Sequence, residues 1–271
     1  MTQHPPGLAR RAVIVHQGGT EQHGEDWLAE ETPVELRYNG EAFAVMMATP
    51  ADLEDFAHGF SLSEGRVARA SDIHSVTVHE QLEGYVVDIQ ASGVLAVDDD
   101  SARLMPGRSG CGLCGNRHLE DVLEPMPPRV PDGPVLAPGA LERALGALAQ
   151  RQPLNSCTGA VHAAAWASIE GEILYVREDV GRHNAVDKLL GALSREGADM
   201  RSGFVLVTSR ASYEVVTKAA RLGVGLLAAI SAPTALAVEL ARASNLTLAG
   251  FVRPGRHVVY THPQRLGDGI A

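Results

Sequence analysis

The feature that most limits how this chain can fold is a regular alternation of short apolar strands and amphipathic helices along its second half. Such alternation, with short loops between the elements, is typical of an α/β sheet covered by helices. Ligands of these sheets bind at the carboxyl ends of the strands, so we expect the functional site in the loops at 208–210, 231–234 and 251–256. The predicted elements are a hairpin over 162–169 and 172–177, helices over 183–194, 212–222 and 233–243, strands over 204–208, 225–230 and 246–252, and a closing strand over 257–260.

The first half of the chain has a mixed pattern. Residues 1–31 are polar and rich in Gly and Glu, which predicts a flexible N-terminal arm. Residues 32–48 predict a hairpin. Apolar residues alternate at Val34, Leu36 and Tyr38, Asn39-Gly40 is the preferred two-residue turn, and the apolar segment Ala42–Met46 forms the returning strand. The same reading predicts a helix from Thr49 to Leu62, strands over 73–78 and 85–89, irregular chain over 98–108 and a short helix over 117–123.

Five prolines between residues 125 and 134 predict a stiff connector, and a helix over 138–150 follows it. The chain has 271 residues, of which 45% are hydrophobic, enough for a sizeable buried core. The predicted organisation is therefore the flexible arm, a smaller N-terminal α+β portion over 32–135, and a C-terminal α/β portion over 136–271 that binds a ligand.

The net charge of −10 argues against non-specific binding of nucleic acid, which needs clustered Lys and Arg side chains. The arginines are nevertheless unevenly distributed, so a local anion site is compatible with the acidic balance. Those of the C-terminal half include Arg177, Arg182, Arg210, Arg221, Arg253 and Arg256.

Three cysteines are too few, and odd in number, for a secreted disulfide scaffold. Residues 1–11 have no apolar core of a signal peptide, and the longest apolar stretch, Leu222–Pro233, is too short to span a bilayer. We therefore expect a cytoplasmic protein without a membrane partner, whose thiols stay reduced unless they serve redox or metal chemistry.

Cys111 and Cys114 form a Cys-x-x-Cys motif in a glycine-rich loop. Two such thiols can share a metal ion, form a disulfide, or act as a nucleophile and its neighbour. Structural zinc needs about four ligands, and here a second Cys-x-x-Cys is absent and His118 leaves the set incomplete. The surrounding glycines favour an exposed, reactive thiol over a metal site or an incidental pair, and no metal ion is expected.

Cys157 and His162 faintly resemble part of a zinc deaminase motif. That motif places Glu two positions after the His and a Cys-x-x-Cys later in the chain, whereas Ala164 stands here and the Cys pair comes earlier. Deaminase chemistry is therefore disfavoured. Taken alone, Cys157 is more typical of a small buried side chain and His162 of a satisfied core residue.

Two further segments can bind anions. Residues 177–188 place Arg182 and His183 at a helix start, where free backbone N–H groups and the helix dipole favour an anion; a solvated helix cap with salt bridges is an equal alternative. Arg253 and Arg256 flank Gly255 after a predicted strand, where two guanidinium groups can bind phosphates, or form only a basic turn.

Five segments, taken in order, resemble the FdhD family of formate dehydrogenase accessory sulfurtransferases. They are Cys111–Gly115, Thr158–His162, Glu178–Lys188, Ser209–Glu214 and Ser231–Ala237, and the resemblance extends from about Glu31 to Gln264. It implies a cytidine-deaminase-like three-layer α/β fold without the deaminase zinc, and homodimers.

The resemblance also implies the activity. A cysteine desulfurase donates sulfur, Cys111 carries it as a persulfide with Cys114 assisting, and the acceptor is the molybdenum bis(molybdopterin guanine dinucleotide) cofactor of formate dehydrogenase. Cofactor contacts are implied for Phe251, Val252, Arg253, Pro254, Gly255 and Arg256. Arg182 and His183 are added here because a helix start suits pyrophosphate. The alternatives are a cofactor-binding chaperone without turnover and a structural zinc protein.

Overall fold

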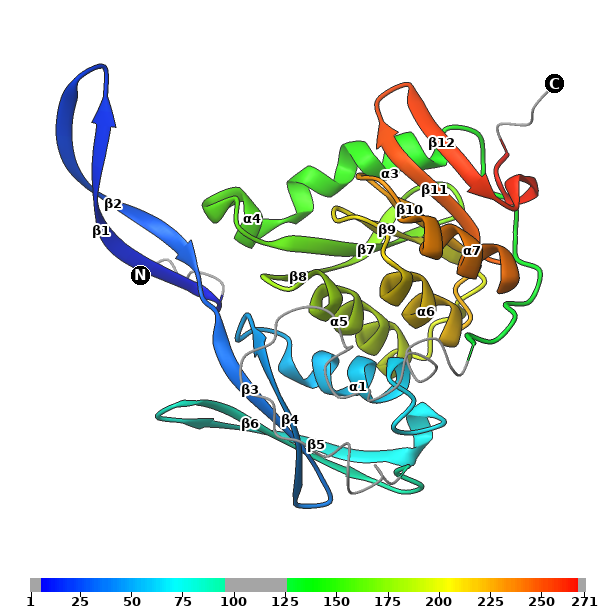
Figure 1. Ribbon diagram of the computed structural model, residues 1–271, viewed down its shortest axis with the longest axis horizontal. Helices are drawn as coiled ribbons and strands as arrows, with labels where there is room; N and C mark the ends of the chain where they lie inside the picture. The colour runs from blue at the N-terminus through cyan, green and yellow to red at the C-terminus, as the bar shows by residue number, and fades with distance from the viewer. Residues whose placement is uncertain (1–5, 96–125, 268–271) are drawn as a thin grey trace.

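The computed structural model describes residues 6–95 and 126–267, so Cys111, Cys114 and the helix predicted over 117–123 lie outside the described residues. Its largest element is a six-stranded mixed sheet in the order β12-β11-β10-β9-β7-β8 (Figure 1). The central strands β9, β10 and β11 are parallel, and the strands outside them are antiparallel to their neighbours. The strands are β7 (His162–Ser168), β8 (Ile173–Asp179), β9 (Gly203–Val207), β10 (Leu226–Ala229), β11 (Thr247–Arg253) and β12 (Arg256–Thr261).

Helices cover both faces of this sheet, as predicted. Successive strand residues point to opposite faces, so Val205 and Leu227 pack in one core while Leu206 and Ala228 pack in the other. The first core is closed by α5 (Arg182–Arg195), α6 (Tyr213–Arg221) and α7 (Ala235–Ala243), and the second by α3 (Ala140–Leu148). Shorter helical segments are η2 (Ala149–Arg151), α4 (Pro153–Thr158) and η3 (Pro263–Arg265).

The N-terminal portion is a four-stranded sheet in the order β4-β3-β6-β5, packed on one helix. The predicted hairpin over 32–48 is confirmed, and Asn39 and Gly40 both have positive φ (52° and 88°), as a tight hairpin turn requires. The elements are β3 (Thr32–Tyr38), β4 (Glu41–Ala48), α1 (Leu53–Ser63), η1 (Ala70–Asp72), β5 (Ile73–Gln81) and β6 (Gly84–Ala91).

The helix predicted from Thr49 begins later, at Leu53. Thr49 is fully buried, and its backbone and hydroxyl bond to groups 130 residues away, which keeps it out of the helix.

Helices α1 and α5 join the two sheets by backbone contact. Figure 1 shows α1 next to α5. Gly59 of α1 and Gly191 of α5 lie where the two backbones approach most closely. A Cβ atom on Gly59 would come within 1.7 Å of the Asp187 carbonyl oxygen, and one on Gly191 within 1.8 Å of the Asp55 carbonyl oxygen. Only glycine allows this approach, so these two positions fix how the two sheets sit against each other.

Residues 8–29 differ from the sequence-based expectation of a flexible arm. They form a two-stranded antiparallel hairpin, β1 (Leu8–Gln17) and β2 (Thr20–Ala29), that projects from the body (Figure 1). Gly18 and Gly19 both have positive φ and make the turn. The hairpin was missed because its apolar residues do not alternate with polar ones, which is the usual signal of a half-buried strand.

The proline-rich connector packs against the C-terminal portion where it is described. Val130 is buried in the core beneath α5, α6 and α7, and its backbone N–H donates to the Ser244 carbonyl oxygen at 2.8 Å. The Asn245 side chain donates to the Val130 carbonyl oxygen. The residues just before the predicted boundary at 135/136 therefore pack with the second portion, and the division of the chain itself stays a prediction.

Candidate functional site

One edge of the large sheet collects the loops in which the sequence placed the site. The parallel strands β9, β10 and β11 end here, and β7 begins here because it runs antiparallel to β9. Helices α5, α6 and α7 start at the same edge, with Gly181, Ser212 and Thr234 as their N-caps. Three helix N-termini with free backbone N–H groups make this edge favourable for anions.

Hydrogen bonds hold the loops of this edge side by side. The Thr234 N–H donates to the Ala211 carbonyl oxygen at 3.0 Å, which joins the loop after β10 to the loop after β9. The Phe251 N–H donates to the Ser231 carbonyl oxygen at 3.1 Å, which joins the end of β11 to the loop after β10. The edge is therefore a continuous strip of loops along the sheet.

The turn from β11 to β12 carries the predicted residues 251–256. Arg253 and Arg256 are direct partners across the two strands, so two like charges stand opposite each other. Like charges directly opposite destabilise a strand pair, and an anion between them would remove that repulsion. Both side chains are exposed, while Val252 is buried in the sheet core.

Backbone geometry also distinguishes this turn. Phe251 has a positive φ of 51° although it is not glycine, and 40% of its area is exposed. Strained conformations of this kind persist only where surrounding contacts enforce them, and they cluster at functional sites. Gly255 has a φ of 69°, and its N–H donates to the carboxylate of Glu142 in α3 at 3.1 Å, which anchors the turn to the helix on the second face.

Arg253 is partly occupied by the protein itself. Its Nη1 donates to the carbonyl oxygens of Ile230 and Val252, which ties the turn to the end of β10. A guanidinium group has five N–H donors. Within residues 6–95 and 126–267 no side-chain hydrogen bond uses the Nε or Nη2 group of Arg253, so these groups suit an external acceptor. Arg253 therefore combines a structural contact with the predicted ligand contact.

The start of α5 places the other predicted pair, Arg182 and His183. The Nε2 atom of His183 lies 2.6 Å from a carboxylate oxygen of Glu214 in α6, and about a tenth of each side chain is exposed. The Ser212 hydroxyl lies 3.4 Å from the same nitrogen. The Arg182 Nε atom is buried without a hydrogen-bond partner among the described residues. Glu214 thus orients His183, a relation between residues 31 positions apart that no local sequence signal reveals.

His162 differs from its sequence-based interpretation as a satisfied core residue. It opens β7 at this edge and is half-buried. Burial lowers the pKa of His162 from its ordinary value of 6.5, and the positive charges of Arg182 and His183 lower it further. His162 lies beside the site because it is the first residue of β7. Since β7 runs antiparallel to β9, it begins at the edge where β9 ends.

Most of the polar residues in 177–188 are neither a solvated cap nor ligands of an open anion site. Asp179 and Lys188 form a fully buried ion pair with 2.6 Å between Nζ and the carboxylate oxygen. Lys188 also donates to the Thr49 carbonyl oxygen, and Asp179 accepts from the N–H groups of Thr49 and Gly181. Buried charges need such complete hydrogen bonding, so this network connects α5 to the chain before α1.

A second buried network lies further along α5. The Lys218 ammonium group donates to the carboxylates of Asp187 and Glu64 and to the Ser63 hydroxyl. Two carboxylates share one cation: Lys218 lowers the pKa of Glu64, while complete burial raises the pKa of Asp187. Burial opposes the charge on Lys218, but the two carboxylates outweigh it and raise its pKa. The network ties α1, α5 and α6 together.

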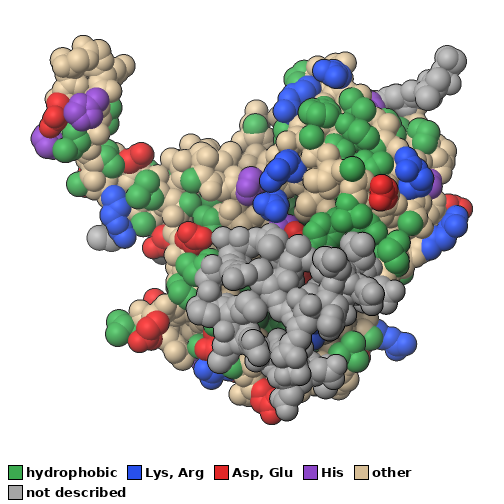
Figure 2. All heavy atoms as spheres, in the orientation of Figure 1, with side chains coloured by type: hydrophobic (Ala, Val, Ile, Leu, Met, Phe, Trp, Pro, Cys, Tyr) green, Lys and Arg blue, Asp and Glu red, His purple; other side chains and the backbone are tan. Residues whose placement is uncertain are grey.

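The two predicted ligand groups share the edge but stand apart along it. Strands β10, β9 and β7 lie between the β11–β12 turn and β8, which leads into α5. The His183 ring nevertheless reaches toward the middle of the strip, because it contacts Glu214 and Ser212 at the start of α6, which follows β9. Figure 2 shows Lys or Arg side chains and His side chains near the middle of this face of the molecule. The strip therefore suits an elongated ligand with negative charges along its length.

Of the three cysteines, only Cys157 lies among the described residues. Cys111 and Cys114 lie outside the described residues, so their assignment stays a prediction. Cys157 is in α4 and is exposed, contrary to the expectation of a buried small side chain. Within residues 6–95 and 126–267, no group of three or more His, Cys, Asp or Glu side chains is placed to share a metal ion.

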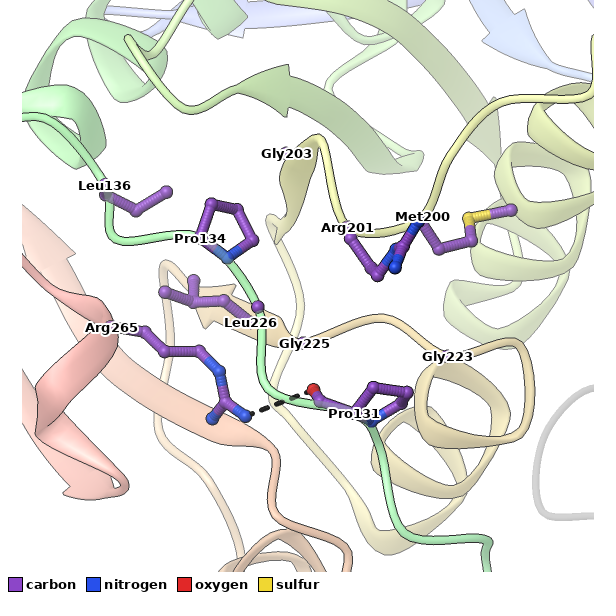
Figure 3. A pocket seen from close by; sticks show the side chains of 11 residues that line it. Pro131, Pro134, Leu136, Met200, Arg201, Gly203, Gly223, Gly225, Leu226 and Arg265 are labelled. Carbon is purple, nitrogen blue, oxygen red and sulfur yellow. Dashed lines mark hydrogen bonds between the residues drawn. The ribbon is translucent and has the colours of Figure 1, made fainter.

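A small pocket lies at the opposite end of the sheet (Figure 3). Gly203 and Leu226, at the amino ends of β9 and β10, help to line it, and its volume is about 10 Å³. That volume is close to the space of one water molecule. Arg265 donates to the Pro131 carbonyl oxygen beside it, and burial lowers the pKa of Arg265. The pocket is too small for an organic ligand and is part of the packing.

Comparison with known protein families matches residues 29–267 to the FdhD/NarQ family. The chain belongs to this family. The family resemblance inferred from the sequence is thereby confirmed, and the match includes both sheets and the strip of loops at the strand ends.

Relatives of the family cover nearly the whole chain. The sulfur carrier protein FdhD of Xanthomonas euvesicatoria pv. vesicatoria is 53% identical over 267 residues, which are 98% of this chain and 95% of that protein. The sulfur carrier protein FdhD of Cupriavidus necator is 52% identical over 97% of this chain and 91% of its own length. A crystal structure of a candidate formate dehydrogenase accessory protein from Desulfotalea psychrophila matches with a TM-score of 0.74 and 26% identity, over 96% of this chain and 100% of that chain.

The described helices were also compared with the requirements of a membrane span. None of those in residues 6–95 and 126–267 is both long and apolar enough to cross a bilayer.

Proposed function

We propose that this chain is a sulfur carrier protein required for formate dehydrogenase activity. The observation that carries the proposal is its membership of the FdhD/NarQ family, with relatives at 52–53% identity that are named sulfur carrier proteins. In this proposal a cysteine desulfurase is the donor, Cys111 is the carrier, and the molybdenum bis(molybdopterin guanine dinucleotide) cofactor is the acceptor. The chain then acts as a sulfurtransferase in the cytoplasm.

The chemistry of the two thiols supports this division of roles. The Cys111 thiolate attacks the outer sulfur of the donor persulfide; a new S–S bond forms, the donor S–S bond breaks, and the donor leaves as a thiolate. No net oxidation occurs in this step. The Cys114 thiolate can then attack the inner sulfur, so that the outer sulfur leaves as sulfide with the bonding electrons and a Cys111–Cys114 disulfide remains. A thiol reductant restores both thiols.

The strip of loops at the strand ends supports the acceptor. Pyrophosphate groups suit helix N-termini and exposed guanidinium groups, and the strip offers both at its two ends. Arg253 and Arg256 would bind one end of the cofactor, with the rest of the turn 251–256 around them. Arg182 and His183 would bind a second anionic group at the start of α5.

Further properties belong to the same proposal. We expect a homodimer, a fold related to cytidine deaminases, no resident metal ion and no nucleic-acid partner. A second candidate function is a chaperone that holds the cofactor without transferring sulfur. The strip of loops supports the chaperone as much as it supports the carrier, because binding of the cofactor alone needs no reactive thiol.

The deciding experiment is a mass spectrum of the purified chain after incubation with a cysteine desulfurase and cysteine. We expect a gain of one sulfur atom that maps to Cys111, and its loss in Cys111→Ala. Cys157→Ala is the matched control, because Cys157 is an exposed thiol outside the loop and its removal should leave the gain intact. A chain that gains no sulfur contradicts the carrier and leaves the chaperone. An equal gain in Cys111→Ala contradicts the assignment of Cys111 as the carrier residue.

A further inference from the structure

A cavity of about 370 Å³ lies where the N-terminal and C-terminal portions of the chain meet. Leu222, on its wall, packs against the cores of both portions. Figure 1 shows α1, α5 and α6 together in this part of the molecule, and the cavity lies at the carboxyl ends of these helices. It is lined by residues between 62 and 70, by Gly93 and Leu95, and by Ser194, Met200, Arg221 and Leu222.

This junction cavity is separate from the strip of loops, which lies at the amino ends of α5 and α6. Its size and walls suit a small organic molecule. Small-molecule pockets have volumes of about 300–1,000 Å³, are mostly apolar, and occur preferentially between domains. Here Leu62 and Val67 of the N-terminal portion and Met200 and Leu222 of the C-terminal portion form apolar walls. An apolar body between these walls would be removed from water on two sides, which favours its binding.

The charges of the junction cavity have one sign. Among the described residues that line it, the charged ones are Arg69 and Arg221, and none is Asp or Glu. This is the reverse of the whole chain, whose net charge is −10. A lining with cations and without carboxylates attracts an anion, and a guanidinium group can bind a carboxylate through two parallel hydrogen bonds.

Both guanidinium groups have donors available for such an anion. Arg221 donates from Nη1 to the Ser63 carbonyl oxygen, and within residues 6–95 and 126–267 its Nε and Nη2 groups take part in no further hydrogen bond. Arg69 is exposed, and the Asp72 carboxylate beside it accepts from the Arg69 backbone N–H rather than from the side chain.

The carboxylate next to the cavity in the sequence is already neutralised. Glu64 accepts a hydrogen bond from Lys218, and its pKa is lowered by the positive charge of Lys218 and also by those of Arg221 and Arg66. Three cations therefore surround Glu64, and Lys218 also binds the carboxylate of Asp187. The positive charge of Arg221 is thus not cancelled by this cluster and remains for a ligand in the cavity.

We propose that the junction cavity binds a small organic anion with an apolar body, of the class of aromatic carboxylates. Its anionic group lies between Arg69 and Arg221, and its apolar body lies against Leu62, Val67 and Leu222. The site goes beyond the proposed sulfur transfer, because neither the Cys-x-x-Cys motif nor the strip of loops takes part in it.

Calorimetry of the full chain with naphthalene-2-carboxylate as the probe tests the proposal. Wild type should bind it with a dissociation constant below about 1 mM. Naphthalene-2-carboxamide lacks the charge and acetate lacks the apolar body, so each should bind at least about tenfold more weakly. Saturation with guanosine diphosphate, a probe of the strip of loops, should leave the affinity for naphthalene-2-carboxylate unchanged.

Two variants test the location. Arg69→Glu reverses one of the two charges, and Ser194→Phe fills the cavity from α5 while leaving both arginines in place. Each should weaken binding of naphthalene-2-carboxylate at least about tenfold with an unchanged far-ultraviolet circular dichroism spectrum. Arg129→Glu is the matched control, because Arg129 is an exposed arginine outside the cavity, and its affinity should equal that of wild type.

Several results would overturn the proposal. They are a wild type that does not bind the probe, equal affinities for the carboxylate and the carboxamide, displacement of the probe by guanosine diphosphate, and an unchanged affinity in either Arg69→Glu or Ser194→Phe. Displacement by guanosine diphosphate would assign the probe to the strip of loops instead of the junction cavity.

Discussion

The glycine contact between α1 and α5 allows a quantitative test of how the two sheets are held together. In Gly191→Ala the new methyl group would lie 1.8 Å from the Asp55 carbonyl oxygen and 2.6 Å from the Gly59 backbone nitrogen. Real Cβ atoms keep about 3.0 Å from such neighbours, so the helices must separate by about 1.2 Å. Backbone atoms cannot rotate away as a side chain does, and the whole crossing has to move.

The cost follows from what the separation disturbs. Overpacked cores lose about 1–3 kcal/mol, and a backbone clash belongs at or above the upper end of that range. The buried networks around Lys188 and Lys218 span the same crossing and lose geometry as well. Alanine recovers about 1 kcal/mol through its higher helix propensity. We therefore expect Gly191→Ala to lower the free energy of unfolding by at least about 2 kcal/mol.

Urea unfolding followed by circular dichroism measures the change. Gly146→Ala is the matched control, because Gly146 is also a helical glycine, in α3. Apart from its own helix, no described atom lies within 4 Å of the position that its Cβ would take. There the same substitution should stabilise the chain by about 0.5–1 kcal/mol. Equal effects of the two substitutions, or a stabilised Gly191→Ala, would refute the close-contact reasoning.

Three further predictions concern the ion pair beneath the site, the histidine beside it and its arginines. Lys188→Met should lower the free energy of unfolding by about 3–5 kcal/mol in the same urea assay, since Asp179 is left buried without its cation; a loss below about 1 kcal/mol would contradict the pairing. The folded state depresses the pKa of His162, so the unfolded state binds more protons and the free energy of unfolding should fall as pH drops below about 6.5. His162→Gln should make this dependence of the free energy of unfolding on pH less steep in urea titrations. An unchanged dependence in the variant would argue against the depressed pKa of His162. Arg256→Ala should weaken binding of guanosine diphosphate by about 1.5–3 kcal/mol in calorimetry while the exposed Arg129→Ala leaves it unchanged, and equal affinities of all three chains would exclude the turn as a phosphate site.

Sequence reasoning predicted the large sheet well because its signals are local. Each strand of the second half is a short apolar run between turn residues, and the predicted elements agree with β9, α6 and β11 to within one or two residues. The alternation of strands with helices indicated that the strands run parallel. Parallel strands end at the same edge of a sheet, and this alone placed the loops 208–210, 231–234 and 251–256 together. The location of the candidate site therefore needed no knowledge of long-range contacts.

The errors arose where long-range contacts decide the outcome. Asp179 and Lys188 have the sequence pattern of an exposed helix start, yet partners near Thr49, 130 residues away, make them buried. His183 gained its Glu214 partner through the packing of α6 on α5. Cys157 is exposed because α4 is a short surface helix that the apolar pattern did not indicate. In each case tertiary packing overrode the local preference.

The face of α5 explains how the fold and the site depend on each other. Asn184, Asp187, Lys188 and Gly191 recur at helical spacing, and each contacts α1 or the chain leading into it. This face fixes the position of the helix along its axis, while Arg182 and His183 at its first turn lie at the strand ends. A change in the α1 contact would therefore displace the first turn relative to the arginines of the β11–β12 turn, which are held by Glu142 and Ile230 instead. The distance between the two ends of the strip is thus set by the polar residues that the sequence places inside the protein.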